Sequence, residues 1–101
     1  MTLAILGGTG PQGQGLALRF AQAGINVAIG SRNPERATEI AENLSSKLSA
    51  GSSNINGYNN ETAIQKADEM VILAVPWSGH NSTLQGLKNQ LIGKILVDIV
   101  C

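Results

Sequence analysis

The chain alternates short apolar runs with longer segments in which apolar residues recur every three or four positions. Short continuous apolar runs are typical of strands that are buried on both faces of a parallel sheet. Such runs, together with one weaker segment, predict strands at residues 3–6, 25–29, 54–58, 70–75 and 95–100. The weakest of these predictions is 54–58, because the stretch 49–57 is rich in Ser, Gly and Asn and predicts a loop.

The segments between these runs predict four helices. The first helix presents an apolar face and is expected to stop at Gly24. The second spans residues 34–48, with Asn33 as its cap and Pro34 as its first residue. Its apolar stripe consists of Ala37, Ile40, Ala41, Leu44 and Leu48. Two more helices are expected, one capped by Asn60 and running through Lys66 or Ala67, and one from Ser78 or Gly79 to Gln90.

This alternation predicts an α/β fold with a doubly wound parallel sheet of the Rossmann-like type. We expect five strands and about four helices in three layers, because the crossover helices of such a fold cover both faces of the sheet. The length suits a single domain over residues 1–101. Ligands of such sheets bind beyond the carboxyl ends of the strands, at the point where the strand order reverses.

Gly8, Gly10 and Gly13 follow the first predicted strand in the spacing G-x-G-x-x-G. In a dinucleotide site these glycines allow a tight turn, a close approach to the pyrophosphate and close contact between helix and strand. The helix N-terminus that follows attracts a pyrophosphate without a basic side chain, and residues 1–18 contain no Lys or Arg. A purely structural glycine turn is the alternative, but the helix and the strand that come next favour the nucleotide site.

The end of the second predicted strand indicates which nucleotide is bound. A site for NAD usually has Asp or Glu there, which binds the ribose hydroxyls. This chain has Gly30, Ser31 and Arg32 instead, so no carboxylate repels a 2′-phosphate. Arg32 can form a charge-assisted fork to that phosphate and Ser31 can add a hydroxyl donor. The pattern therefore predicts a site for NADP(H).

Arg36 lies near the start of the second predicted helix and could contact the same phosphate. The alternative is a weak surface ion pair with Glu39 or Glu42 on the exposed face of that helix. The choice between the two roles stays open from the sequence.

The segment after the fourth predicted strand is expected to line the nicotinamide half of the site. Val75 and Pro76 end that strand. Trp77 either excludes water from the nicotinamide half of the site or packs beneath a loop. His80 has a useful pKa range, but a lone His near a helix start is more often a cap or a surface residue, so no catalytic role is assigned to it.

Asp98 and Cys101 are the remaining candidates in the last predicted strand and after it. Asp98 stands within an apolar run, where a buried carboxylate needs hydrogen-bond partners; it either bonds loop N–H groups or helps to shape the cleft. Cys101 is the only cysteine and has no neighbouring base, so neither a nucleophile nor an internal disulfide is expected.

Composition and charge exclude several classes of partner. Seven basic and seven acidic residues give no net charge, and the basic residues are scattered, so we expect no binding to nucleic acid or to an anionic membrane. No apolar run has the length of a membrane span or the form of a secretion signal. We therefore expect a cytoplasmic, soluble protein without a metal cluster, whose partners are small-molecule cofactors.

The segments GGTGPQGQGLALRFAQAG, VAIGSRNPERA and ILAVPW resemble the amino-terminal half of the NADPH-dependent F420 reductases. The resemblance covers nearly the whole chain. It implies that Thr9, Gly10, Pro11 and Gln12 hold the pyrophosphate, that Ser31, Arg32 and Arg36 hold the 2′-phosphate, and that Val75 and Pro76 lie near the nicotinamide. The implied reaction is hydride transfer between NADP(H) and the deazaflavin coenzyme F420, governed by geometry rather than by an acid–base residue.

The resemblance also implies that family members continue for about as many residues again, completing the deazaflavin pocket and a homodimer. Two alternatives therefore stay open. The first is an NADP-binding or redox-sensing module without catalysis, because Gly7, Gly10 and Gly13 also fit G-x-x-G-x-x-G, and no Tyr-x-x-x-Lys pair is present. The second is a reductase of another small substrate, such as an imine, on the same fold.

Overall fold

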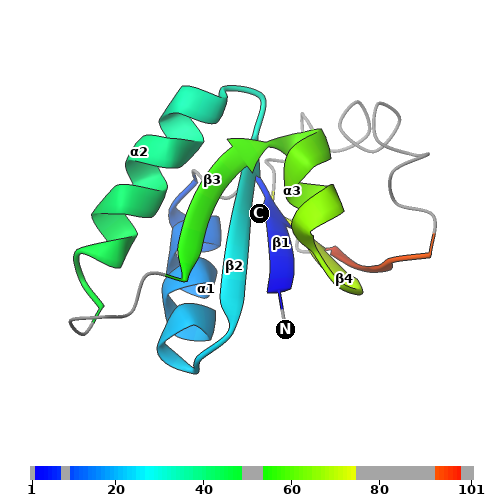
Figure 1. Cartoon of the computed structure of the whole chain (residues 1–101), viewed down its shortest axis with the longest axis horizontal. Coiled ribbons are helices and arrows are strands. Elements are labelled where there is room, and N and C mark those ends of the chain that lie inside the picture. Colours follow the sequence, from blue (N-terminus) through cyan, green and yellow to red (C-terminus); the bar gives the residue numbers. More distant parts are fainter. Residues whose placement is uncertain (1, 8–9, 49–53, 75–92, 99–101) are drawn as a thin grey trace.

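The structure of the chain is a computed structural model that describes residues 2–7, 10–48, 54–74 and 93–98. The described strands are β1 (Thr2–Leu6), β2 (Asn26–Ser31), β3 (Ile55–Asn59), β4 (Met70–Leu73) and β5 (Ile95–Asp98). The described helices are α1 (Pro11–Gln22), α2 (Pro34–Ser45) and α3 (Asn60–Lys66) (Figure 1). The fourth predicted helix, from residue 78 or 79 to Gln90, lies outside the described residues.

The strands form one parallel sheet in the order β3-β2-β1-β4-β5. The chain moves outward from β1 through β2 to β3 and then returns across the sheet to place β4 on the other side of β1 (Figure 1). The strand order therefore reverses between β1 and β4, which is where doubly wound sheets bind their ligands. The predicted Rossmann-like α/β class is confirmed.

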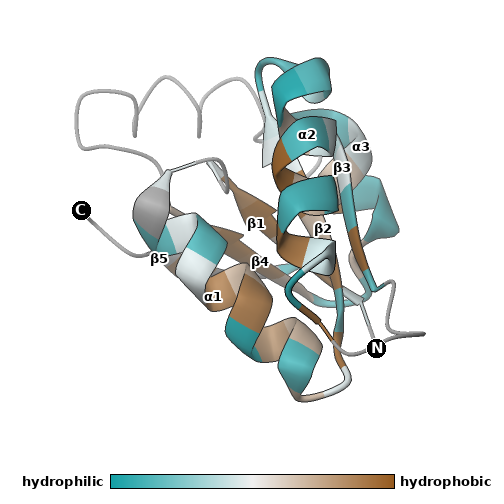
Figure 2. Ribbon diagram, turned by 90° about the vertical axis from the view of Figure 1, so that its left-hand side faces the viewer, coloured by the Kyte–Doolittle hydropathy of each residue, from teal (hydrophilic) through white to brown (hydrophobic). Residues whose placement is uncertain are grey.

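Helices cover both faces of this sheet, as the predicted three layers require. Helices α1 and α2 pack on one face and α3 packs on the other, over β1, β2 and β3. The strands in the centre are strongly apolar, whereas much of α2 is hydrophilic (Figure 2). Successive residues of each strand point to opposite faces, so each face has its own core.

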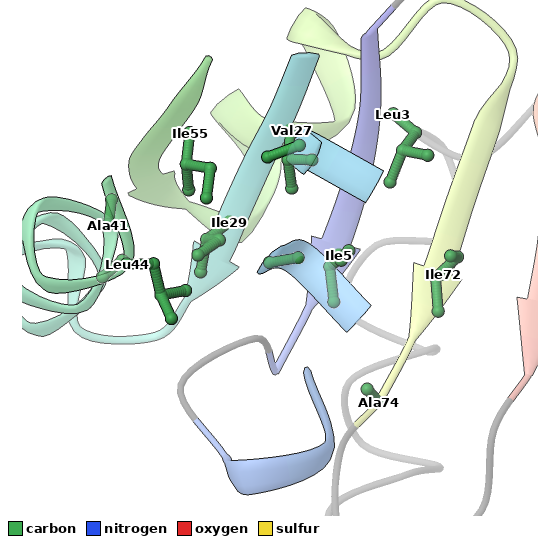
Figure 3. Packing of buried hydrophobic residues seen from close by; sticks show 12 residues of the cluster. Leu3, Ile5, Val27, Ile29, Ala41, Leu44, Ile55, Ile72 and Ala74 are labelled. Atoms are coloured by element: carbon green, nitrogen blue, oxygen red, sulfur yellow. The ribbon is translucent and has the colours of Figure 1, made fainter. Parts of the chain in front are cut away.

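The larger core lies under α1 and α2. Leu3 and Ile5 of β1, Val27 and Ile29 of β2, and Ile72 of β4 are each at most 3% exposed within it (Figure 3). The second core lies under α3, and its buried members are Ala4, Leu6, Ala28, Ala63, Ile64, Ala67, Val71 and Leu73. Small alanines at the helix positions let α3 approach the strands closely.

Two helix ends differ from the predictions. Helix α2 ends at Ser45 instead of continuing to residue 48, because the turn tightens: Lys47 N–H donates to Leu44 O and Leu48 N–H to Ser45 O. The apolar stripe nevertheless continues, since Leu48 still packs against the larger core.

The predicted cap of the third helix was wrong by one residue. The side chain of Asn59, not that of Asn60, accepts a hydrogen bond from the Thr62 N–H at 2.7 Å, and Asn60 is the first helical residue. Two consecutive asparagines are equally good caps by composition, so the sequence could not distinguish them. Strand β2 also extends further than predicted, through Ser31.

Candidate functional site

The candidate site lies at the carboxyl ends of β1 and β2. Leu6 and Gly30 are paired in register at the end of these strands, and Gly7 N–H donates to Gly30 O at 2.9 Å. The glycine-rich turn after β1 and the Ser31-Arg32 segment at the end of β2 therefore begin side by side. This brings together the two segments that the sequence assigned to one nucleotide.

The described part of the glycine turn is held by its own main chain. Gly7 has a φ of 72°, in the left-handed region that favours glycine, and Gly10 N–H donates to Gly7 O at 3.3 Å. On the other side of β1, Ala74 N–H donates to Leu6 O at 2.8 Å and continues the pairing with β4. Gly7 was not among the predicted site residues, although the doubled glycine at positions 7 and 8 was a signal for it.

Helix α1 begins directly at this turn, with Gly10 as its N-cap and Pro11 as its first residue. The N-cap residue Gly10 has no side chain that could cap this N-terminus, and the first turn of the described helix holds no acidic residue. A Cβ atom at Gly10 would meet only Gly7 O, at 3.8 Å, so no contact within the described chain requires a glycine there. A helix N-terminus with glycine at the N-cap suits an anionic ligand group such as a pyrophosphate.

The turn between β2 and α2 carries the other predicted residues. Ser31 is partly buried, whereas Arg32 and Arg36 are exposed. The Ser31 hydroxyl oxygen accepts a hydrogen bond from Asn33 N–H at 3.1 Å, and Asn33 Oδ1 accepts one from Arg36 N–H at 3.2 Å. Ser31 ends β2, Arg32 follows it and Arg36 lies in the first turn of α2, so one short segment carries a hydroxyl and two guanidinium groups, a donor set that fits a phosphate monoester.

The alternative partners of Arg36 do not engage it here. Among the residues that the structure describes, no ion pair joins the Arg36 guanidinium to Glu39 or Glu42. The phosphate role of Arg36 remains a prediction.

Several predicted residues lie outside the described ranges. Among the cofactor-binding residues these are Gly8, Thr9, Val75 and Pro76; among the other candidates they are Trp77, His80 and Cys101. Gln12 is exposed and Gly13 is buried within α1, while Asp98 ends strand β5. The roles predicted for Pro11, Gln12, Gly13 and Asp98 stay predictions.

The described part of the chain contains no group of three or more His, Cys, Asp or Glu side chains that could hold a metal ion. None of its helices has the length and apolar character needed to cross a membrane.

The parallel sheet in the order β3-β2-β1-β4-β5, with helices on both faces, belongs to the Rossmann-like class of nucleotide-binding folds. The family model described as "NADP oxidoreductase coenzyme F420-dependent" matches residues 2–101. The chain belongs to this family.

Similar proteins agree with this assignment. The chain is 42% identical over 98 residues to the F420-dependent NADP reductase of Methanothermobacter marburgensis, covering 97% of this chain and 43% of that protein. It is 44% identical over 101 residues to the F420-dependent NADP reductase of Methanocaldococcus jannaschii, and the match covers 98% of this chain and 44% of that protein. The chain therefore spans less than half the length of these relatives. A more distant relative is the metalloreductase STEAP3 of Rattus norvegicus, 34% identical over 92 residues, which cover 91% of this chain and 16% of that protein.

Solved structures show the same fold. An imine reductase from Bacillus cereus superposes with a TM-score of 0.72 at 25% identity, covering 98% of this chain and 31% of that one. A minor L-lactate dehydrogenase from Enterococcus mundtii gives a TM-score of 0.67 at 20% identity, and the match covers 98% of this chain and 36% of that one. At this identity the likeness shows a shared fold only.

Proposed function

We propose that residues 1–101 form one NADP(H)-binding domain of a reductase that transfers hydride between NADP(H) and coenzyme F420. The observation that carries this proposal is the hydrogen bond from Gly7 N–H to Gly30 O, which sets the glycine turn beside the Ser31-Arg32 segment. Family membership and the names of the reductases described above support the choice of F420 as the second reactant.

The predicted residues would share the work of binding. Gly8, Thr9, Gly10, Pro11, Gln12 and Gly13 would surround the pyrophosphate, Ser31, Arg32 and Arg36 would hold the 2′-phosphate, and Val75 and Pro76 would face the nicotinamide. Bound nicotinamide supplies or accepts the hydride, and the chain supplies placement rather than an acid or a base. The proposal therefore assigns no catalytic residue.

The test is a titration with NADPH and with NADH, followed by nicotinamide fluorescence, in the wild-type chain and in Arg32→Ala. NADPH affinity is expected to fall tenfold or more in the variant, which corresponds to about 1.4 kcal/mol for a lost phosphate contact. NADH affinity should hardly change, because NADH has no 2′-phosphate.

Arg19→Ala is the matched control for this titration. Arg19 is an exposed arginine in the last turn of α1, at the opposite end of that helix from the glycine turn. Its removal lowers the net charge equally but should leave both affinities unchanged. Equal losses in the two variants, or no binding of either nucleotide, would contradict the proposed site.

A reductase of another small substrate is the second candidate function. The likeness to an imine reductase over 98% of this chain favours it. Mixing the chain with NADPH and either F420 or a cyclic imine, while NADPH absorbance is followed, separates the two. Oxidation of NADPH with the imine alone would favour the second candidate. Binding of NADPH without turnover of either substrate would instead favour a non-catalytic module.

We also propose that the protein works in the cytoplasm as a homodimer. Strand β5 is an edge of the described sheet, and Val97 on it is 37% exposed, which leaves apolar surface and main-chain groups for association. Light scattering coupled to size-exclusion chromatography should give twice the chain mass; a monomer at high concentration would refute the dimer.

A further inference from the structure

Asn33 is the residue around which the turn between β2 and α2 is built. Its main-chain N–H donates to the Ser31 hydroxyl oxygen, and its side-chain Oδ1 accepts from Arg36 N–H. Its main-chain carbonyl oxygen accepts a hydrogen bond from Ala37 N–H at 3.1 Å. Asn33 thus forms hydrogen bonds with Ser31 and with Arg36, two of the three residues predicted to hold the 2′-phosphate.

The bond to Ser31 leaves its hydroxyl able to act as a donor. Asn33 N–H occupies one of the two acceptor lone pairs of the oxygen, and the O–H can still donate to a ligand. A phosphate offers only acceptor oxygens at the pH where it is fully charged, so a donating hydroxyl is the useful orientation.

The turn is also fixed to the core at its other end. Ala37 is fully buried, and the main chain of Ala37 lies against Gly57 of β3. The hydrogen bond from Ala37 N–H to Asn33 O therefore ties Asn33 to a position that cannot shift easily. Through the Asn33 side chain, the Arg36 main chain is held in the first turn of α2.

We propose that Asn33 is a positioning residue for the 2′-phosphate, which it holds indirectly by preassembling Ser31, Arg32 and Arg36. This inference rests on the proposed NADP(H) site. Asn33 would increase affinity for ligands that carry a 2′-phosphomonoester and would have little effect on the same ligands without it.

The test compares Asn33→Ala with the wild-type chain by isothermal titration calorimetry. The ligands are adenosine 2′,5′-bisphosphate and AMP, which differ by the 2′-phosphate and lack the nicotinamide. Asn33→Ala should bind the bisphosphate about fivefold more weakly, as expected when a helix cap is lost. AMP affinity should change by less than about twofold. Equal weakening for both ligands would overturn the proposal.

Asn33→Ser serves as the rescue variant. Serine also caps helices and carries no charge, so it should restore binding of the bisphosphate to near the wild-type level. A serine variant that binds the bisphosphate as weakly as the alanine variant would contradict the positioning role.

Asn59→Ala is the matched control, because Asn59 caps α3 with the same side-chain chemistry at the same edge of the sheet. It should lower stability about as much as Asn33→Ala without changing the ratio of the two affinities. A similar change of that ratio in Asn59→Ala would mean that general loosening of the edge, not positioning by Asn33, explains the effect.

Arg32→Ala distinguishes failure of this inference from failure of the proposed function. If Arg32→Ala abolishes the preference for the bisphosphate and Asn33→Ala does not reduce it, only the positioning role fails. If Arg32→Ala has no effect, the phosphate site itself is absent, and the inference falls with it.

Discussion

Gly57 lies where helix α2 comes closest to the sheet. A Cβ atom at this position would overlap the main chain of Ala37 and Thr38. Because these are backbone atoms inside α2, they cannot move aside without moving the helix. The sequence placed Gly57 in a loop-like stretch rich in Ser, Gly and Asn, so its packing role could not be predicted from composition.

Gly57→Ala should therefore lower the free energy of unfolding by about 2–3 kcal/mol, as overpacked positions do. It should also weaken binding of NADPH, because α2 carries Arg36 and begins at the Asn33 turn. Urea denaturation and the fluorescence titration measure the two effects.

Gly15→Ala is the control for this substitution. Gly15 lies within α1, and a Cβ atom there would have nothing within 4 Å. Alanine is a better helix former than glycine, so this variant should be more stable by about 0.5–1 kcal/mol. A destabilised Gly15→Ala together with a neutral Gly57→Ala would contradict the packing described here.

Asn54 connects three elements at the amino-terminal side of the sheet. Its Nδ2 donates to Ala21 O in α1 at 3.0 Å and to Ile25 O, just before β2, at 2.9 Å. Its main-chain carbonyl oxygen accepts a hydrogen bond from Val27 N–H at 2.7 Å. A residue that the sequence assigned to the start of a poorly defined strand thus satisfies the carbonyls at the turn from α1 to β2.

Asn54→Ala should lower the free energy of unfolding by about 1–3 kcal/mol, since it removes the side-chain donor to two partly buried carbonyls, of which Ala21 O keeps a hydrogen bond from Gly24 N–H. Asn54→Asp should cost more, because a carboxylate cannot donate and would face the same two oxygens. Asn56 is an exposed asparagine on β3, two residues further along, and Asn56→Ala should change stability by no more than about 0.5 kcal/mol. Equal effects of Asn54→Ala and Asn56→Ala in urea denaturation would refute this role.

Among helices and strands, apolar patterns predicted β1, β2, β4, β5, α1 and α2, whereas β3 was expected only as a weak strand in a stretch rich in Ser, Gly and Asn, and α3 was expected from a capping asparagine. The ends were less predictable, because they depend on single hydrogen bonds. Helix α2 stops when Lys47 N–H turns to Leu44 O, and α3 is capped by the first of two adjacent asparagines. In the site, Ser31, Arg32 and Arg36 were named from the sequence and their roles stay predictions, whereas the hydrogen bond from Asn33 N–H to the Ser31 hydroxyl depends on the conformation of the turn.

At the scale of the whole molecule, the order of the sheet links the two halves of the site. The outward run from β1 to β2 puts the glycine turn and the Ser31-Arg32 segment on neighbouring strands, and the return to β4 puts Ala74 on the other side of β1. The alternation of strands and helices predicted this arrangement, because right-handed crossovers leave few other topologies. The nature of the hydride acceptor could not be predicted in this way, since fold does not determine substrate.

Binding of NADPH should stabilise the whole chain through mass action. At a ligand concentration 100 times the dissociation constant, the expected gain is about 2.7 kcal/mol. For a domain of this size each kcal/mol raises the melting temperature by about 4–8 °C, so a rise of roughly 10–20 °C is expected. Differential scanning calorimetry measures it directly.

NADH at the same concentration should raise the melting temperature much less, because it lacks the phosphate that Ser31, Arg32 and Arg36 are proposed to hold. In Arg32→Ala a tenfold weaker affinity leaves only about 1.4 kcal/mol of the stabilisation by NADPH, so roughly half of the temperature rise should remain. The unliganded variant should melt close to the wild-type chain, since Arg32 is exposed and forms no ion pair with another described residue. Equal rises with NADPH and NADH in the wild-type chain would mean that the turn after β2 does not recognise a 2′-phosphate.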